Sequence, residues 1–175
     1  MTIKQPIAGS GIFSTLPDST ANSLLEFFLY YAAPVRLSPL SLDLEHELTS
    51  EDKDSLIDDL CVMAKCEKTD LCYIGLSNAK GVELERLGLS DESFLADRPK
   101  GFFWQYKANR KDALPEHEFD CIIKHLRNSM AHGRICSYGK LALFEDKNND
   151  ITMRFVVDPN ALVSWSSAIE ERVDA

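Results

Sequence analysis

The segment from residue 115 to residue 133 constrains the fold of this chain more than any other. Pro115 suits the first turn of a helix, and Gly133 is a natural helix stop. Between them, apolar side chains recur every three or four residues and fall on one stripe of a helical wheel. These are Phe119, Ile122, Ile123, Leu126 and Met130. The sequence therefore predicts a long amphipathic helix over 115–133 whose apolar stripe faces a core.

The residues before this segment are mainly helical in pattern. A helix that is apolar on nearly all sides is expected to begin near Asp18 and to end by Pro34. A second helix is expected to begin at Thr49 or Ser50, with acidic residues in its first turn. Further elements are expected as follows: a strand or a helix over 71–76, and helices over 82–87, 92–96 and 102–109.

The hydrophobic period changes after the long helix. Two short runs rich in branched and aromatic residues flank a polar turn with adjacent asparagines, which predicts a β-hairpin over 140–157. Asp158 then provides an N-cap, and Pro159 a first-turn residue, for a last helix over 159–172. We therefore predict a mainly α fold: a helical bundle that carries a small β-hairpin and a C-terminal helix.

Length and cysteine usage indicate a single intracellular domain. The 175 residues suggest an irregular lead-in over 1–17 and one domain over 18–175. The most apolar run, 24–35, is far shorter than the roughly 20 residues that cross a bilayer, and no signal peptide is predicted. The five cysteines are odd in number and form no CxxC pair, which favours reduced thiols over disulfides or zinc. We expect a cytoplasmic protein with no metal, cofactor or membrane partner.

The charge is distributed unevenly along the chain. The net charge is −9, which by itself argues against broad binding to nucleic acids. Between residues 98 and 140, however, nine basic residues stand against four acidic ones, so this window carries +5 and the remainder −14. Such a segment on an acidic body can accept a polyanion at one place. A chance fluctuation on solvated faces is the alternative.

The long helix also carries a polar face with few charges. Cys121, His125, Asn128 and His132 lie opposite the apolar stripe on the helical wheel. An ordinary solvated face would carry lysine and glutamate, so this face suits a second protein surface. A solvent-exposed face that lacks charge is the other interpretation.

The end of this helix resembles the signature of HEPN domains. Residues 127–134 read RNSMAHGR, and they follow the apolar lead-in 122–126. The family motif is an arginine, a polar residue directly after it, and a histidine a few residues further on, late in a long helix. The strong likeness covers about residues 115–140, and the hairpin after the motif is similar to that of several prokaryotic members.

The resemblance implies a metal-independent endoribonuclease that acts as a homodimer. Its catalytic residues would be Arg127, Asn128 and His132. A histidine can move the protons of a cleavage that uses the 2′-hydroxyl of RNA, and an arginine fork matches phosphate oxygens. Five residues separate Arg127 from His132, which is about 140° around a regular helix. In the family, two such helices pair across a dimer, so that both arginines and both histidines line one cleft.

Three more residues of this segment are candidates for substrate binding. They are His125, Ser129 and Arg134. Arg134 contacts the substrate or acts as a cation at the end of the helix, and His125 lines the cleft or belongs to the dimer interface. Some HEPN toxins have a tyrosine, which a partner enzyme modifies, two residues after the histidine. This chain has Arg134 there, so that kind of control is not expected.

Three functions compete on this evidence. The first is a ribonuclease that serves as a toxin or defence effector, with an antitoxin or another regulatory protein as a partner. The second is a non-catalytic HEPN dimer that binds RNA or a protein. The third is an unrelated helical scaffold, which would be monomeric. The intact set of Arg127, Asn128 and His132 favours the first, and the acidic total charge favours the second.

Overall fold

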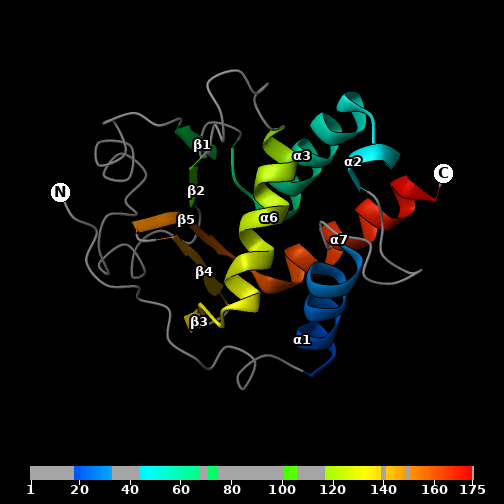
Figure 1. Ribbon diagram of the computed structural model, residues 1–175. Coiled ribbons are helices and arrows are strands. Elements are labelled where there is room, and N and C mark those ends of the chain that lie inside the picture. The colour runs from blue at the N-terminus through cyan, green and yellow to red at the C-terminus, as the bar shows by residue number, and fades with distance from the viewer. Residues whose placement is uncertain are drawn as a thin grey trace.

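In the computed structural model, one layer of helices packs on one face of a five-stranded sheet (Figure 1). The structure describes residues 18–32, 44–67, 71–74, 101–105, 117–138, 141–148 and 150–174. The elements in chain order are α1 (Asp18–Leu25), η2 (Glu26–Tyr31, a π-helix), α2 (Leu44–Glu47), α3 (Ser50–Ala64), β1 (Leu71–Ile74), β2 (Gly101–Gln105), α6 (Glu118–Ala131), β3 (Ile135–Tyr138), β4 (Leu141–Asn148), β5 (Asp150–Val157) and α7 (Pro159–Val173).

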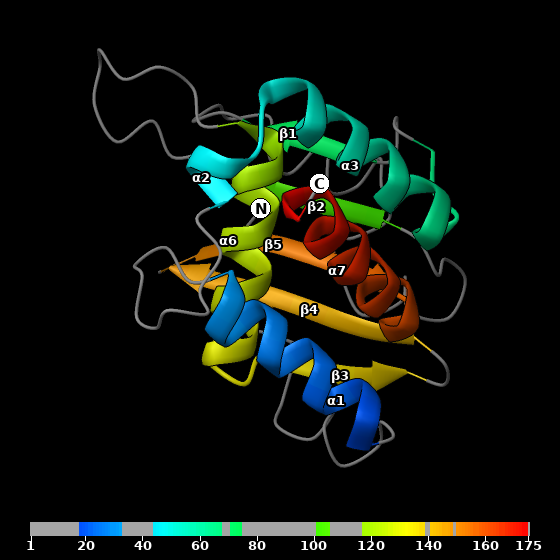
Figure 2. The ribbon, with the colours of Figure 1, turned by 90° about the vertical axis from the view of Figure 1, so that its right-hand side faces the viewer.

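The predicted hairpin lies at the centre of a larger sheet. The strand order is β1-β2-β5-β4-β3, with β1 and β2 parallel and every other pair antiparallel. The long helices α1, α3, α6 and α7 all lie on the same side of this sheet, as Figure 2 shows. Among the described helices, none is long and apolar enough to cross a membrane.

Most elements with strong local signals are confirmed. Helices hold more residues than strands, as predicted, and the long helix, the hairpin and the C-terminal helix all form. The long helix begins at Glu118, with His117 as its N-cap, rather than at Pro115. Thr49 caps α3 in a capping box with Asp52, which lowers the pKa of the Asp52 carboxyl through its hydrogen bond with the Thr49 side chain. Asp158 caps α7 by accepting a hydrogen bond from the backbone N–H of Asn160, and Pro159 is in its first turn.

Two predictions need correction. The sheet has five strands rather than two, and residues 101–105 form β2 instead of the start of a helix over 102–109. The register of β2 explains this difference, because Phe102 lies opposite Phe155 on β5, more than 50 residues away. Because the two strands are so far apart in the sequence, the residues near Phe102 carry no local pattern that would predict this pairing. Residues 71–74 form strand β1, which resolves the ambiguity there.

Other predictions fall outside the described residues or stay untested. The lead-in over 1–17 and the helices over 82–87 and 92–96 lie outside the described residues. The likeness to a HEPN bundle stays a prediction.

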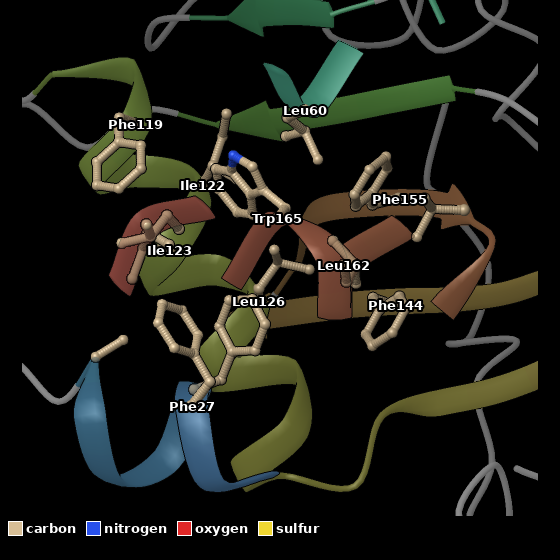
Figure 3. Packing of buried hydrophobic residues seen from close by; sticks show 14 of the residues in the cluster. Phe27, Leu60, Phe119, Ile122, Ile123, Leu126, Phe144, Phe155, Leu162 and Trp165 are labelled. Atoms are coloured by element: carbon tan, nitrogen blue, oxygen red, sulfur yellow. The ribbon is translucent and has the colours of Figure 1, made fainter. Parts of the chain in front are cut away.

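The main core lies between the sheet and the helices. Figure 3 shows Trp165 of α7 among side chains of α3 and α6. Its ring meets Phe119 edge to face, with the centroids 5.7 Å apart, and its Nε1 donates to the backbone oxygen of Leu56 at 2.7 Å. Because Trp165 is fully buried, this one side chain joins three helices through both apolar contact and a hydrogen bond.

Trp165→Phe should lower the free energy of unfolding by about 1–3 kcal/mol, because it leaves the buried Leu56 carbonyl oxygen without this donor and removes buried ring atoms. Urea titration followed by circular dichroism measures the change. Ser164→Ala, at an exposed position on the same helix, is the control and should stay within about 0.5 kcal/mol of the wild type. Equal stabilities for the two variants would contradict this role of Trp165.

Candidate functional site

Helix α6 ends in a motif that places His132 and Arg134 on a defined backbone. Gly133 has a left-handed φ of 60°, its N–H donates to the Met130 oxygen at 3.0 Å, and the N–H of Arg134 donates to the Ser129 oxygen at 2.8 Å. This pair of bonds is a Schellman motif. The predicted stop at Gly133 is confirmed, and His132 is an exposed residue at the end of the helix.

Arg127 lies one turn before His132 and is half-buried. Its Nε is buried, yet it has no hydrogen-bond partner within the part of the chain that the structure describes. Leaving a buried donor unpaired costs about 1–3 kcal/mol, and more when the group is charged. In native structures such a donor usually bonds to protein or to an ordered water molecule.

Asn128 and His125 are tied to the sheet of their own chain. Both side chains hydrogen-bond to Oδ2 of Asp146 on β4: Nδ1 of His125 at 2.7 Å and Nδ2 of Asn128 at 3.1 Å. Asp146 is 5% exposed and His125 is 8% exposed. Helix α6 runs beside β4, as Figure 1 and the contacts between these elements agree.

These contacts correct the interpretation of the polar face. Cys121 and His125 are buried against their own chain, Asn128 is half-buried, and His132 alone of the four is exposed. The face lacks charges because most of it packs inside this chain, so it is not a surface ready for a second protein. His125 therefore belongs neither to an open cleft nor to a dimer interface in this structure.

Ser129 is also closed to a substrate. It is fully buried, and its hydroxyl donates to the backbone oxygen of Leu126 at 2.6 Å. Arg134 differs, because it is half-buried. Its N–H takes part in the helix end, and its backbone oxygen accepts from the Glu145 N–H of β4 at 3.0 Å. Of the three predicted substrate-binding residues, Arg134 alone keeps a partly exposed position.

The structure thus groups Arg127, Asn128, His132 and Arg134 at the C-terminal end of α6. On a regular helix Arg127 and His132 would lie about 140° apart around the axis. Helix α6 is regular up to Ala131, and His132 is its C-cap.

Sequence reasoning missed Asp146, which lies within the hairpin predicted over 140–157 but was not named as a candidate. In the structure β4 continues to Asn148, and Asp146 lies just before a shift in register at Lys147. A signal was available, because Ala142, Phe144 and Asp146 alternate along the strand and so share one face. Ala142 and Phe144 belong to the core. The alternation of side chains along the strand therefore predicts that Asp146 faces the helices as they do.

No metal site can be built from the described residues. Within those ranges, no group of three or more histidine, cysteine, aspartate or glutamate side chains could hold a metal ion. The expected absence of a metal stays a prediction.

Comparison of the chain with family models, with curated proteins and with solved structures found no match. The HEPN resemblance therefore depends on the motif helix and its surroundings.

Gly133→Ala should lower the free energy of unfolding by about 1–2 kcal/mol, because a side chain is strained at this left-handed φ although no atom lies within 4 Å of the added Cβ. Thermal and urea unfolding measure the loss. Gly133→Asn is the matched control and should lose less, since asparagine tolerates this conformation. A wild-type stability for Gly133→Ala would mean that the motif does not hold the helix end.

Proposed function

We propose that this chain is a metal-independent endoribonuclease of the HEPN type that acts as a homodimer. The observation that carries the proposal is the presence of an exposed His132 and a half-buried Arg127 at one end of α6. A guanidinium is suited to phosphate oxygens, and an exposed imidazole is suited to proton transfer. The +5 segment that contains both residues favours a polyanionic substrate.

The reaction follows from these two groups. A base takes the proton of the 2′-hydroxyl, whose oxygen attacks the adjacent phosphorus. The bond from phosphorus to the 5′-oxygen breaks, and an acid protonates that oxygen. Histidine can take either proton role, and in the dimer His132 of one chain and the partner subunit's His132 share them. Arg127 stabilises the extra negative charge on the phosphorus centre.

The dimer forms around the end of α6 rather than along the whole polar face. Cys121 and His125 are buried within their own chain, so the second copy meets the part of the helix that stays open. That part includes the exposed Ala131 and His132 and the half-buried Arg127 and Asn128. Two copies placed end to end over this region bring each arginine toward the partner's histidine, which compensates for the angle between them within one chain.

His132→Ala should reduce RNA cleavage by about a hundredfold or more, because it removes a proton-transfer group. Its stability should change by less than about 0.5 kcal/mol, because the side chain is exposed. Fluorescent RNA in excess EDTA measures cleavage, and urea titration measures stability.

His117→Ala is the matched control at the other end of the same helix. His117 caps α6 by accepting from the Phe119 N–H at 3.2 Å, so its loss should cost about 1 kcal/mol of stability and leave cleavage intact. If the two variants lost cleavage equally, or His132→Ala cut at the wild-type rate, His132 would not be catalytic. RNA binding by the wild type without cleavage would favour the non-catalytic dimer instead.

The products should carry a 2′,3′-cyclic phosphate or a 3′-phosphate on one side and a 5′-hydroxyl on the other. DNA should be spared because it lacks the attacking 2′-hydroxyl. End-labelling and mass spectrometry of the fragments measure these ends, with an RNA that carries one 2′-deoxy substitution at the cut site as the control. Loss of cleavage in EDTA with rescue by Mg²⁺, or equal cutting of an all-deoxy substrate, would contradict the mechanism.

A further inference from the structure

Asp146 links the sheet to the motif helix through two side chains. A single oxygen of its carboxylate accepts from His125 at 2.7 Å and from Asn128 at 3.1 Å. Asp146 comes from β4, 18 residues beyond Asn128 in the chain, and it is almost fully buried. Hydrogen bonds to an ionised acceptor in such surroundings are short and strong.

This contact determines which way the Asn128 amide faces. In the structure the amide nitrogen of Asn128 is the donor to the Asp146 carboxyl oxygen, so this end of the amide faces Asp146. The carbonyl oxygen of the same amide then faces away from the carboxylate, and the two ends of the amide cannot exchange without breaking the bond. Asp146 therefore leaves the amide oxygen of Asn128 available as an acceptor.

His132 lies one helical turn beyond Asn128. Asn128 and His132 are four residues apart, which makes them neighbours on a helix surface. Their backbones are also joined, because the His132 N–H donates to the backbone oxygen of Asn128 at 3.0 Å. An oriented Asn128 oxygen beside an imidazole can accept its N–H and so select the ring nitrogen that stays available for proton transfer.

We propose that Asp146 is a positioning residue that acts through Asn128 on His132. The inference rests on the proposed ribonuclease function, which it extends from the motif helix to the hairpin. Asp146 itself does not touch the RNA. Its carboxylate holds the Asn128 amide, the amide oxygen offers an acceptor to the His132 imidazole, and the imidazole moves the proton. His125 is the second donor to the same oxygen, and it keeps the carboxylate in place from the helix side.

Asp146→Asn tests this chain of contacts with almost no change of shape. The neutral amide weakens the bond to Asn128 and allows it to turn, so the single-turnover rate of RNA cleavage should fall about tenfold or more. Affinity for an uncleavable 2′-O-methyl RNA should stay within about twofold, because Arg127 is unchanged. Asp120→Asn is the matched control: it breaks the partly buried Lys53–Asp120 ion pair of 2.9 Å at the other end of α6. It should lower stability without lowering the cleavage rate of the folded protein.

A double-mutant cycle separates positioning from general support of the fold. In an Asn128→Ala background, Asp146→Asn should have little further effect on the cleavage rate, because the residue through which it acts is gone. Independent effects that multiply would overturn the inference, and so would a wild-type rate for Asp146→Asn. In both outcomes the ribonuclease proposal stands if the wild type cuts RNA. Failure of the wild type to cut would overturn the proposed function and the inference together.

A measurement on the wild type covers the case in which Asp146→Asn does not fold. Nuclear magnetic resonance can follow hydrogen exchange of the Asn128 side-chain amide, assigned by its loss in Asn128→Ala. This amide should exchange at least about tenfold more slowly than that of the exposed Asn22. Equal exchange rates would mean that Asp146 does not hold the amide, and would overturn the inference.

Discussion

The buried carboxylate of Asp146 is the contact on which the arrangement around α6 depends. Removing a charge from water costs several kcal/mol, and the cost is recovered only if good donors surround it. His125 and Asn128 supply two donors to one oxygen. Because they are three residues apart on α6, they restrain the rotation of the helix about its own axis. That rotation decides which residues of the motif are buried and which are open.

Helix α6 is consequently packed on two sides by contacts of different kinds. Its apolar stripe meets the other helices in the core around Trp165, and its polar side meets β4 through Asp146. The surface of α6 that stays accessible to solvent is a narrow strip along the helix and its last turn. The half-buried Arg127 and the exposed His132 lie there. Both groups are carried by a helix and a defined helix end rather than by a loop, which is the kind of support that a site of accurate geometry requires.

The predictable parts of this protein are those with a local cause. The stripe of α6, the stop at Gly133 and the caps Thr49 and Asp158 are confirmed, because each depends on residues a few positions apart. The hairpin is confirmed for the same reason. Strand β2 was predicted as a helix because its partner β5 is distant in sequence, and the size of the sheet was missed with it. The motif residues were found, but the surroundings of His125, Ser129 and Asn128 were not.

By itself, the amino-acid sequence determined that α6 has one apolar and one polar side and that it ends at His132. It also determined that an arginine, an asparagine and a histidine stand in its last turns. Only the tertiary structure decided that β4 covers the polar side, that His125 and Ser129 are closed, and that His132 is open. The physical reason is that a helical wheel gives the angle between each residue and the core stripe. It does not say which other element of the chain packs against the polar side of the helix. Here that element is β4, whose buried Asp146 carboxylate bonds to His125 and Asn128. The face that the sequence suggested as an interface with another protein is therefore packed inside this chain.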